Sequence, residues 1–147
     1  MYKLRALRTR VWISAAAVAL SGAGLGLATA TPASAYAGYC NGQASKAMSG
    51  AGHFVAKLPA YNGNIDCQMY KGANSSGVKA LQITLNQCYG RSLDEDGIFG
   101  SNTKTALMYA QGQEKIGADG GYGEETRNNI GWFFKNTRGS GGTCAFL

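Results

Sequence analysis

The sequence predicts an all-α fold, a small three-helix bundle with an irregular, disulfide-tied N-terminal arm. Three observations support this prediction. Apolar residues recur at helical spacing after residue 76, a turn motif that begins a helix occurs twice, and residues 36–76 keep neither a helical nor an alternating period. We divide the chain into a signal peptide at 1–35, the arm at 36–76, a three-helix domain at 77–136 and a Gly-rich tail at 137–147.

Residues 1–35 have the order of regions that is typical of a secretory signal peptide. Four basic residues among the first ten precede an uncharged stretch at 11–30 and the small triplet Ala33-Ser34-Ala35. An uncleaved membrane anchor is the alternative, because the uncharged stretch is long enough to span a bilayer. Its second half is rich in Gly, Ala, Ser and Thr, so we expect cleavage after Ala35, secretion and no stable membrane anchor.

Charge and histidine content restrict the function. The chain has 14 Lys and Arg against 8 Asp and Glu, and cleavage removes four of the basic residues, which leaves a net charge of about +2. The basic excess therefore gives no reason to expect nucleic-acid binding. The single histidine, His53, disfavours a zinc hydrolase and leaves only one imidazole for a nucleophile pair.

The arm at residues 36–76 is rich in Gly, Ala, Asn and Ser, and Pro59 and the Asn62-Gly63-Asn64 turn signal interrupt it. A disordered linker is the alternative. Two cysteines and several aromatic residues disfavour it, because a pure linker has no use for them. We therefore expect an irregular segment that packs on the following domain.

Three stretches after residue 76 have helical character. The first can be capped by Ser75 or Ser76 and ended by Gly90. Its apolar stripe consists of Val78, Leu81, Leu85 and Cys88. The second stretch runs from about 101 to 113 and the third from about 124 to 134, with two acidic residues in its first turn that complement the helix dipole.

The junctions between these helices share the pattern Asp-Gly-x-aromatic-Gly-x-x-Thr. It occurs at residues 96–103 and again 23 residues later, at 119–126. In such a turn the first Gly takes a positive φ and the Asp side chain accepts backbone N–H bonds. We expect the aromatic residue to plug into the bundle, the second Gly to cap the helix, and the Thr oxygen to bond back to that cap.

The four cysteines permit three pairings in an oxidising compartment. The pairing of Cys40 with Cys67 and of Cys88 with Cys144 is favoured, because it closes the arm on itself and fastens the C-terminal tail to the first helix. A bridge between Cys67 and Cys88 is the main rival.

These features together resemble the three-helix peptidoglycan-binding domain of secreted bacterial cell-wall proteins. The resemblance covers about Gly77 to Phe134. It rests on Val78-Lys79-Ala80-Leu81-Gln82, Leu85, Asp96-Gly97-Ile98-Phe99-Gly100, Thr103, Ala106-Leu107, Gln111, Asp119-Gly120, Gly123 and Thr126. It implies a non-catalytic module that attaches to the cell wall, commonly beside a hydrolase. Ala110 departs from the family, which usually has a large aromatic residue there.

Peptidoglycan offers hydroxyl, N-acetyl and carboxylate groups, so a site needs turn amides, side-chain amides and an aromatic face. The candidate ligand-binding residues are Gln82, Asp96, Gly97, Phe99, Asn102, Thr103 and Tyr122. For each there is also a structural explanation: the Asp residues form turns, the aromatic residues fill the core, and Gln82 bridges helix to loop.

Metal and catalytic sites are both disfavoured. Asp94, Asp96 and Gly97 imitate part of an EF-hand, but Thr103 stands where a bidentate Glu is needed, so we expect no metal and no cofactor. Neighbouring carboxylates on one short loop cannot flank a glycosidic bond, and the arm is too short for a hydrolase fold. We therefore expect no enzyme.

Two functions follow from these features. The first is a secreted, non-catalytic, cell-wall-associated protein that binds the glycan or the stem peptide of peptidoglycan, with an exported hydrolase as a possible companion. The alternative is a small secreted disulfide-rich protein that binds another exported protein as an inhibitor or adaptor.

Overall fold

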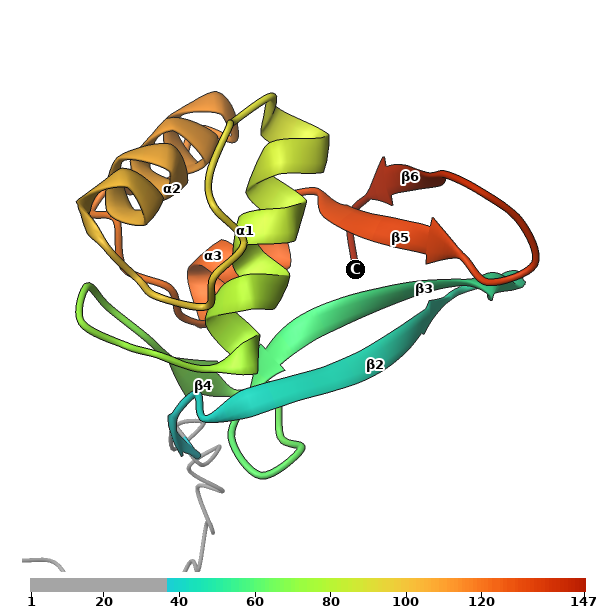
Figure 1. Cartoon of the computed structure of the whole chain (residues 1–147), viewed down its shortest axis with the longest axis horizontal. Coiled ribbons are helices and arrows are strands. Elements are labelled where there is room, and N and C mark those ends of the chain that lie inside the picture. The colour runs from blue at the N-terminus through green and yellow to red at the C-terminus, as the bar shows by residue number, and fades with distance from the viewer. Residues whose placement is uncertain (1–36) are drawn as a thin grey trace, which may run out of the picture. The chain divides into compact units, whose positions relative to one another are not determined.

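The structure, a computed structural model, describes residues 37–147, so the signal peptide predicted for 1–35 lies outside the described residues. Within this range the fold is mixed α/β, with three helices and six strands in two sheets (Figure 1). The prediction of an all-α three-helix bundle is therefore wrong. None of the described helices is both long and apolar enough to cross a membrane.

The N-terminal arm is built from strands and is not irregular. Strands β2 (Gly42–Met48) and β3 (Ala51–Ala60) form an antiparallel hairpin, and Gly50 takes a φ of 72° in its turn. Two short strands, β1 (Gly38–Tyr39) and β4 (Cys67–Gln68), pair in parallel as a separate ladder. Buried and exposed residues alternate along only part of β3, because its last three residues are all buried. The sequence of β3 therefore lacks a clear two-residue period.

The third helix is shorter than predicted. Helix α3 (Glu124–Asn129) ends before the aromatic run, and β5 (Trp132–Asn136) follows it. Trp132 and Phe134 are buried while Phe133 between them is half-buried, which is the period of a strand. β5 pairs with β3 and with β6 (Gly142–Ala145), so that the larger sheet has the order β2-β3-β5-β6.

The first two helices match their predicted bounds. Helix α1 (Ser76–Tyr89) begins where the Ser75 hydroxyl accepts a hydrogen bond from the Val78 N–H, and it ends at Gly90 in the left-handed conformation. Helix α2 (Ser101–Gln113) begins after Gly100. α1 contacts three strands of the larger sheet on one side and α2 on the other.

One hydrophobic core joins the helices to the sheet. Its largest fully buried apolar and aromatic side chains come from β3, β5, the first two helices, the two repeated turns and the residues that follow β4 and α3. They are Trp132, Tyr122, Phe99, Phe134, Leu58, Met69, Leu81, Leu85, Leu107 and Ile130. Because the core includes side chains of both the helices and the sheet, we expect the described part of the chain to fold as a unit.

The two disulfides pair as the sequence favoured. Cys40 bonds to Cys67 and Cys88 bonds to Cys144. The first bridge fastens β4 beside the end of β1, and the second joins the last turn of α1 to β6. The rival bridge between Cys67 and Cys88 is absent.

Candidate functional site

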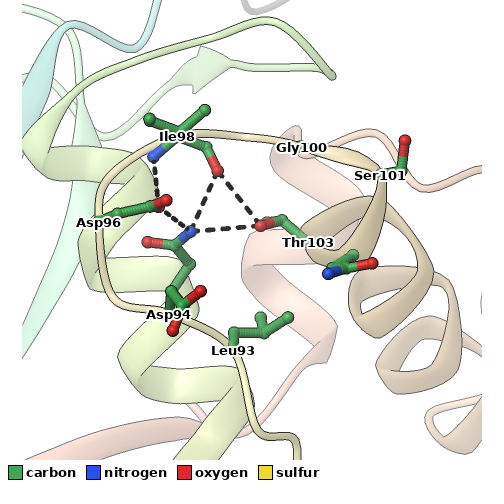
Figure 2. A pocket seen from close by; sticks show the side chains of 9 residues that line it. Leu93, Asp94, Asp96, Ile98, Gly100, Ser101 and Thr103 are labelled. Carbon is green, nitrogen blue, oxygen red and sulfur yellow. Dashed lines mark hydrogen bonds between the residues drawn. The ribbon is translucent and has the colours of Figure 1, made fainter.

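The first repeated turn wraps around the buried side chain of Gln82 on α1. The Gln82 Nε2 donates hydrogen bonds to Asp96 Oδ1 at 2.9 Å, to the Ile98 carbonyl at 3.1 Å and to Thr103 Oγ1 at 3.2 Å. Its Oε1 accepts from the Gly97 N–H at 2.9 Å. Figure 2 shows Asp96, Ile98 and Thr103 converging on this amide. One side chain therefore fixes the loop and the start of α2 together.

The second repeated turn has the same network around Gln111 on α2. The Gln111 Nε2 donates to Asp119 Oδ1 at 3.1 Å and to the Gly121 carbonyl and Thr126 Oγ1, both at 2.9 Å. Its Oε1 accepts from the Gly120 N–H at 2.9 Å. The sequence repeat therefore corresponds to a repeated unit, a helix that presents Gln to the turn that begins the next helix.

The turn chemistry agrees with the predicted pattern in most respects. Gly97 and Gly120 have φ values of 78° and 72°, and the carboxylate before each accepts the backbone N–H two residues on, at 2.9 Å and 2.8 Å. The Thr side chains differ from the prediction. Thr103 Oγ1 donates to the Ile98 carbonyl and accepts from Gln82, so it serves the Gln network and not the helix cap.

The aromatic residues of both turns are core residues. Phe99 and Tyr122 are each 1% exposed, which agrees with the prediction that the aromatic residue of each turn packs in the core. Tyr122 packs edge-on against Trp132, with ring centroids 6.1 Å apart. Burial raises the pKa of the Tyr122 phenol above its usual range. The ring faces of these two residues are therefore unavailable for stacking on a sugar.

A hollow of about 240 Å³ lies over the first turn and the start of α2 (Figure 2). Five of its side chains, those of Asp94, Asp96, Ile98, Ser101 and Asn102, are exposed, whereas Gln82 and Thr103 form its buried floor. The full lining is Gln82, Leu93, Asp94, Asp96, Ile98, Gly100, Ser101, Asn102 and Thr103. We call this the first-turn hollow.

The equivalent position over the second turn is smaller because Tyr70 lies there. The hollow at the second turn measures about 90 Å³, and Tyr70 lines it together with Asp119 and Glu125. A Cβ added at Gly121 would come within 2.6 Å of the Tyr70 ring, so the ring rests directly on the turn backbone. The two repeats share a hydrogen-bond network, but the first is the more open.

Comparison with protein families finds a match for part of the chain. Residues 74–130 match the family described as "Putative peptidoglycan binding domain". The matched part contains all three helices and both Gln networks, and the strands of both sheets lie outside it on either side. The comparisons with curated proteins and with solved structures found no match.

The extent of the family match explains why the predicted fold class was wrong. The resemblance seen in the sequence is confirmed, but it covers only the helical part of a mixed fold. The segment between β4 and α1 joins the two parts. Met69 and Tyr122 exchange backbone hydrogen bonds of 3.0 and 2.9 Å, and the Phe99 N–H donates to the Ala73 carbonyl at 2.8 Å.

The structure brings four of the seven predicted site residues into the first-turn hollow. Gln82, Asp96, Asn102 and Thr103 line it. The other three do not. Gly97 is buried beneath the turn, Phe99 is in the core, and Tyr122 belongs to the second turn.

Sequence reasoning did not select Leu93, Asp94, Ile98, Gly100 or Ser101 as ligand contacts, although all five line the hollow. Their common property is position: they flank the Asp-Gly turn or begin the helix after it. Ile98, Gly100 and Ser101 lie within the repeated motif, so the motif could have identified them as lining residues. Within residues 37–147 no group of three or more His, Cys, Asp or Glu side chains is arranged to hold a metal ion.

Hydrogen bonds to the Asp96 carboxylate lower its pKa. The Ile98 N–H, and then the Gln82 amide, donate to it and hold its pKa below the ordinary value of 3.8. Because the folded pKa is depressed, this group stabilises the fold above pH about 4, and the contribution is lost as the pH falls through the folded pKa.

We therefore expect Asp96→Asn to be less stable than the unsubstituted protein at pH 7, by an amount that shrinks as the pH falls below about 4. Urea unfolding of both proteins at pH 7 and pH 3 measures this. A stability difference that is the same at both pH values would show that the ionised form of Asp96 has no special role.

Proposed function

We propose that the protein is a secreted, non-catalytic protein that binds peptidoglycan at the first-turn hollow. The observation that carries this proposal is the open, polar hollow within the part of the chain that matches the peptidoglycan-binding family. Its exposed polar groups are two carboxylates, a hydroxyl and an amide, from Asp94, Asp96, Ser101 and Asn102, and the exposed Ile98 side chain adds an apolar surface. These groups can accept and donate hydrogen bonds to the hydroxyl, N-acetyl and amide groups of the wall polymer.

The rigid floor supports a role in binding. Gln82 and Thr103 are 1% and 3% exposed, and each is held by the turn backbone. A preformed site loses little conformational entropy when its ligand binds. The side chains above the floor are free to make contacts, since Ser101 and Asn102 donate or accept no side-chain hydrogen bond among the described residues.

The chemistry of the hollow also supports a role without catalysis. Its two carboxylates, Asp94 and Asp96, are two residues apart on one loop and do not face each other across a cleft. Asp96 accepts two hydrogen bonds through Oδ1, which favours its ionised form and makes it a poor proton donor near neutral pH. His53 lies on β3 and does not line the hollow.

Two disulfides support an extracellular location. All four cysteines are paired, and such bonds persist in oxidising compartments. Together with the signal-like segment at residues 1–35, this supports secretion to the cell wall.

A bulky side chain in the hollow tests the proposal. We expect Asn102→Trp to weaken retention on insoluble peptidoglycan at least about tenfold, because the indole fills a space that the ligand needs while the exposed position tolerates the change. Co-sedimentation of the purified protein with wall material, with and without wall teichoic acid, measures the effect.

The control is Gln113→Trp, which adds the same side chain at the exposed last residue of α2, outside the hollow. It should bind like the unsubstituted protein. If neither the unsubstituted protein nor the control is retained on the wall, the proposal fails. Capture of a stoichiometric exported protein from culture medium would then favour the adaptor alternative.

A further inference from the structure

A further hollow, of about 350 Å³, lies mostly outside the matched residues. It is formed where the β1–β4 ladder meets the segment that leads into α1. Its lining consists of Tyr39, Cys40, Asn41, Tyr70, Lys71, Ala73 and Asn74. We call it the tyrosine hollow. Only Asn74 among these residues belongs to the part that matches the peptidoglycan-binding family.

Two exposed aromatic rings distinguish this hollow. Tyr39 is 68% exposed and Tyr70 is 48% exposed. A large aromatic side chain that stays exposed lacks the stabilisation that burial would give. Two such side chains in one hollow indicate a surface that a ligand covers. A tyrosine ring offers an apolar face with a polar tip, which suits a ligand that is itself part apolar and part hydroxylated.

The backbone of Tyr39 and the side chain of Tyr70 are held in place before any ligand binds. The ladder pairs Tyr39 with Gln68 through the backbone, and the Gln68 Oε1 accepts a hydrogen bond from the Tyr70 hydroxyl at 3.1 Å. The disulfide between Cys40 and Cys67 fastens the strand ends directly beside them. The two tyrosines therefore stand on a fixed backbone platform, which limits the entropy lost on binding.

Polar groups surround the platform. Asn41 is held by two hydrogen bonds with Asn62, each of 3.0 Å, whereas Asn74 makes no side-chain hydrogen bond among the described residues. Lys71 is the only charged residue in the lining, and its ammonium group forms no ion pair within residues 37–147. An amide and an ammonium group can donate to carbonyl and hydroxyl oxygens at the edge of a ligand that rests on the rings.

The geometry points to a glycan-binding subsite in the tyrosine hollow, with N-acetylated amino sugars as its ligands. The C–H face of a pyranose ring is apolar and packs on an aromatic face, while its hydroxyl and N-acetyl groups project from the edge toward hydrogen-bond partners such as Asn74 and Lys71. The absence of any acidic residue from the lining fits a neutral or weakly anionic sugar.

The tyrosine hollow and the first-turn hollow share no lining residue, but a backbone contact joins their walls. Asn74, which lines the tyrosine hollow, forms an isolated β-bridge with Ile98, which lines the first-turn hollow. A polymer long enough to cross this bridge would reach both hollows. The inference deepens the proposed function and rests on it to this extent: the strands N-terminal to the domain contact the glycan strand of the same wall polymer.

A soluble glycan tests the subsite directly. We expect chitotetraose, four linked N-acetylglucosamine units, to shift the NMR signals of Tyr39, Tyr70 and Asn74 in the ¹⁵N-labelled, disulfide-intact protein. Tyr39→Ala should weaken this binding at least about tenfold, whereas Tyr39→Phe, which keeps the ring face, should retain most of it. Tyr109→Ala removes a tyrosine that is 42% exposed on α2, outside the hollow, and should have no effect.

The outcomes separate this inference from the proposed function. If chitotetraose causes no shifts, or shifts only the signals of the first-turn hollow, the glycan subsite is refuted, and co-sedimentation with the wall still decides the proposed function. If chitotetraose binds at Tyr39 while the unsubstituted protein is not retained on the wall, the subsite stands and wall binding fails. A Tyr39→Ala variant that melts like the unsubstituted protein but binds chitotetraose equally well also refutes the subsite.

Discussion

Replacing Gln111 with Met is expected to lower the free energy of unfolding by about 2–5 kcal/mol. The Gln111 side chain is 1% exposed and makes four hydrogen bonds with the turn that begins α3. Met has a similar volume, so the substitution leaves no large cavity. It removes the acceptor of the buried Gly120 N–H and one donor to the Gly121 carbonyl. Each buried group that is left without a hydrogen bond costs about 1–3 kcal/mol.

Urea unfolding at pH 7 measures this loss, and Gln113→Met is the matched control. Gln113 is exposed two residues further along the same helix, so its substitution should change stability by no more than about 0.5 kcal/mol. Gln111 does not line the first-turn hollow, and its variant should therefore still bind the wall under conditions where it is folded. Equal stabilities of the two variants would mean that the Gln networks do not stabilise the turns.

The helical part of the molecule could be predicted because its signals are local. Ser75 and Gly90 mark the ends of α1 within a few residues of the apolar stripe that they enclose. The repeated turns are also signalled locally. Asp96 accepts the backbone hydrogen bond and Gly97 has the positive φ that their residue types predict.

The larger sheet could not be predicted because its pairing joins distant segments. β3 pairs with β5 at Ala56 and Phe134, which lie on opposite sides of the whole helical domain in the sequence. No local pattern reports such a contact. The run Trp132-Phe133-Phe134 has the alternating burial of a strand, but it begins soon after α3, and Ile130, Phe133 and Phe134 also have the i, i+3, i+4 spacing of a helix face. A usable signal was present at Ser49-Gly50, a turn dipeptide between the two strands of the hairpin.

The sequence placed candidate residues at the first turn, but it did not indicate the shape of the hollow there. The motif located the first turn, and Asp96 and Asn102 do lie at the surface of the hollow. The difference between the open first turn and the covered second turn depends on Tyr70, which precedes the domain and approaches Gly121 only in the folded chain. The fully buried aromatic side chains outside the matched residues, Trp132 and Phe134, come from β5, whereas Phe54 and Tyr61 of the N-terminal arm are only partly buried against the core.

Removing the bridge between Cys88 and Cys144 is expected to lower the free energy of unfolding by about 2–4 kcal/mol. The bonded residues are 56 positions apart, so the bridge removes many conformations from the unfolded chain. It also has a local role. β6 is an edge strand of four residues with little buried surface, and backbone pairing with β5 is its main other attachment.

The double variant Cys88→Ser/Cys144→Ser, in which the Cys40–Cys67 bridge is kept, separates the two roles of the disulfide. Urea unfolding measures the global loss, and hydrogen exchange measures the local one. We expect the amides of β6 to lose protection before those of α1, because a four-residue edge strand without a covalent tie opens at a small cost in free energy. Thr143→Ser, which changes an exposed residue of the same strand and keeps the bridge, should leave both measurements unchanged. β6 pairs with β5, the strand that carries the buried side chains of Trp132 and Phe134. Full protection of β6 in the double variant would show that this backbone pairing is sufficient to hold β6 in place.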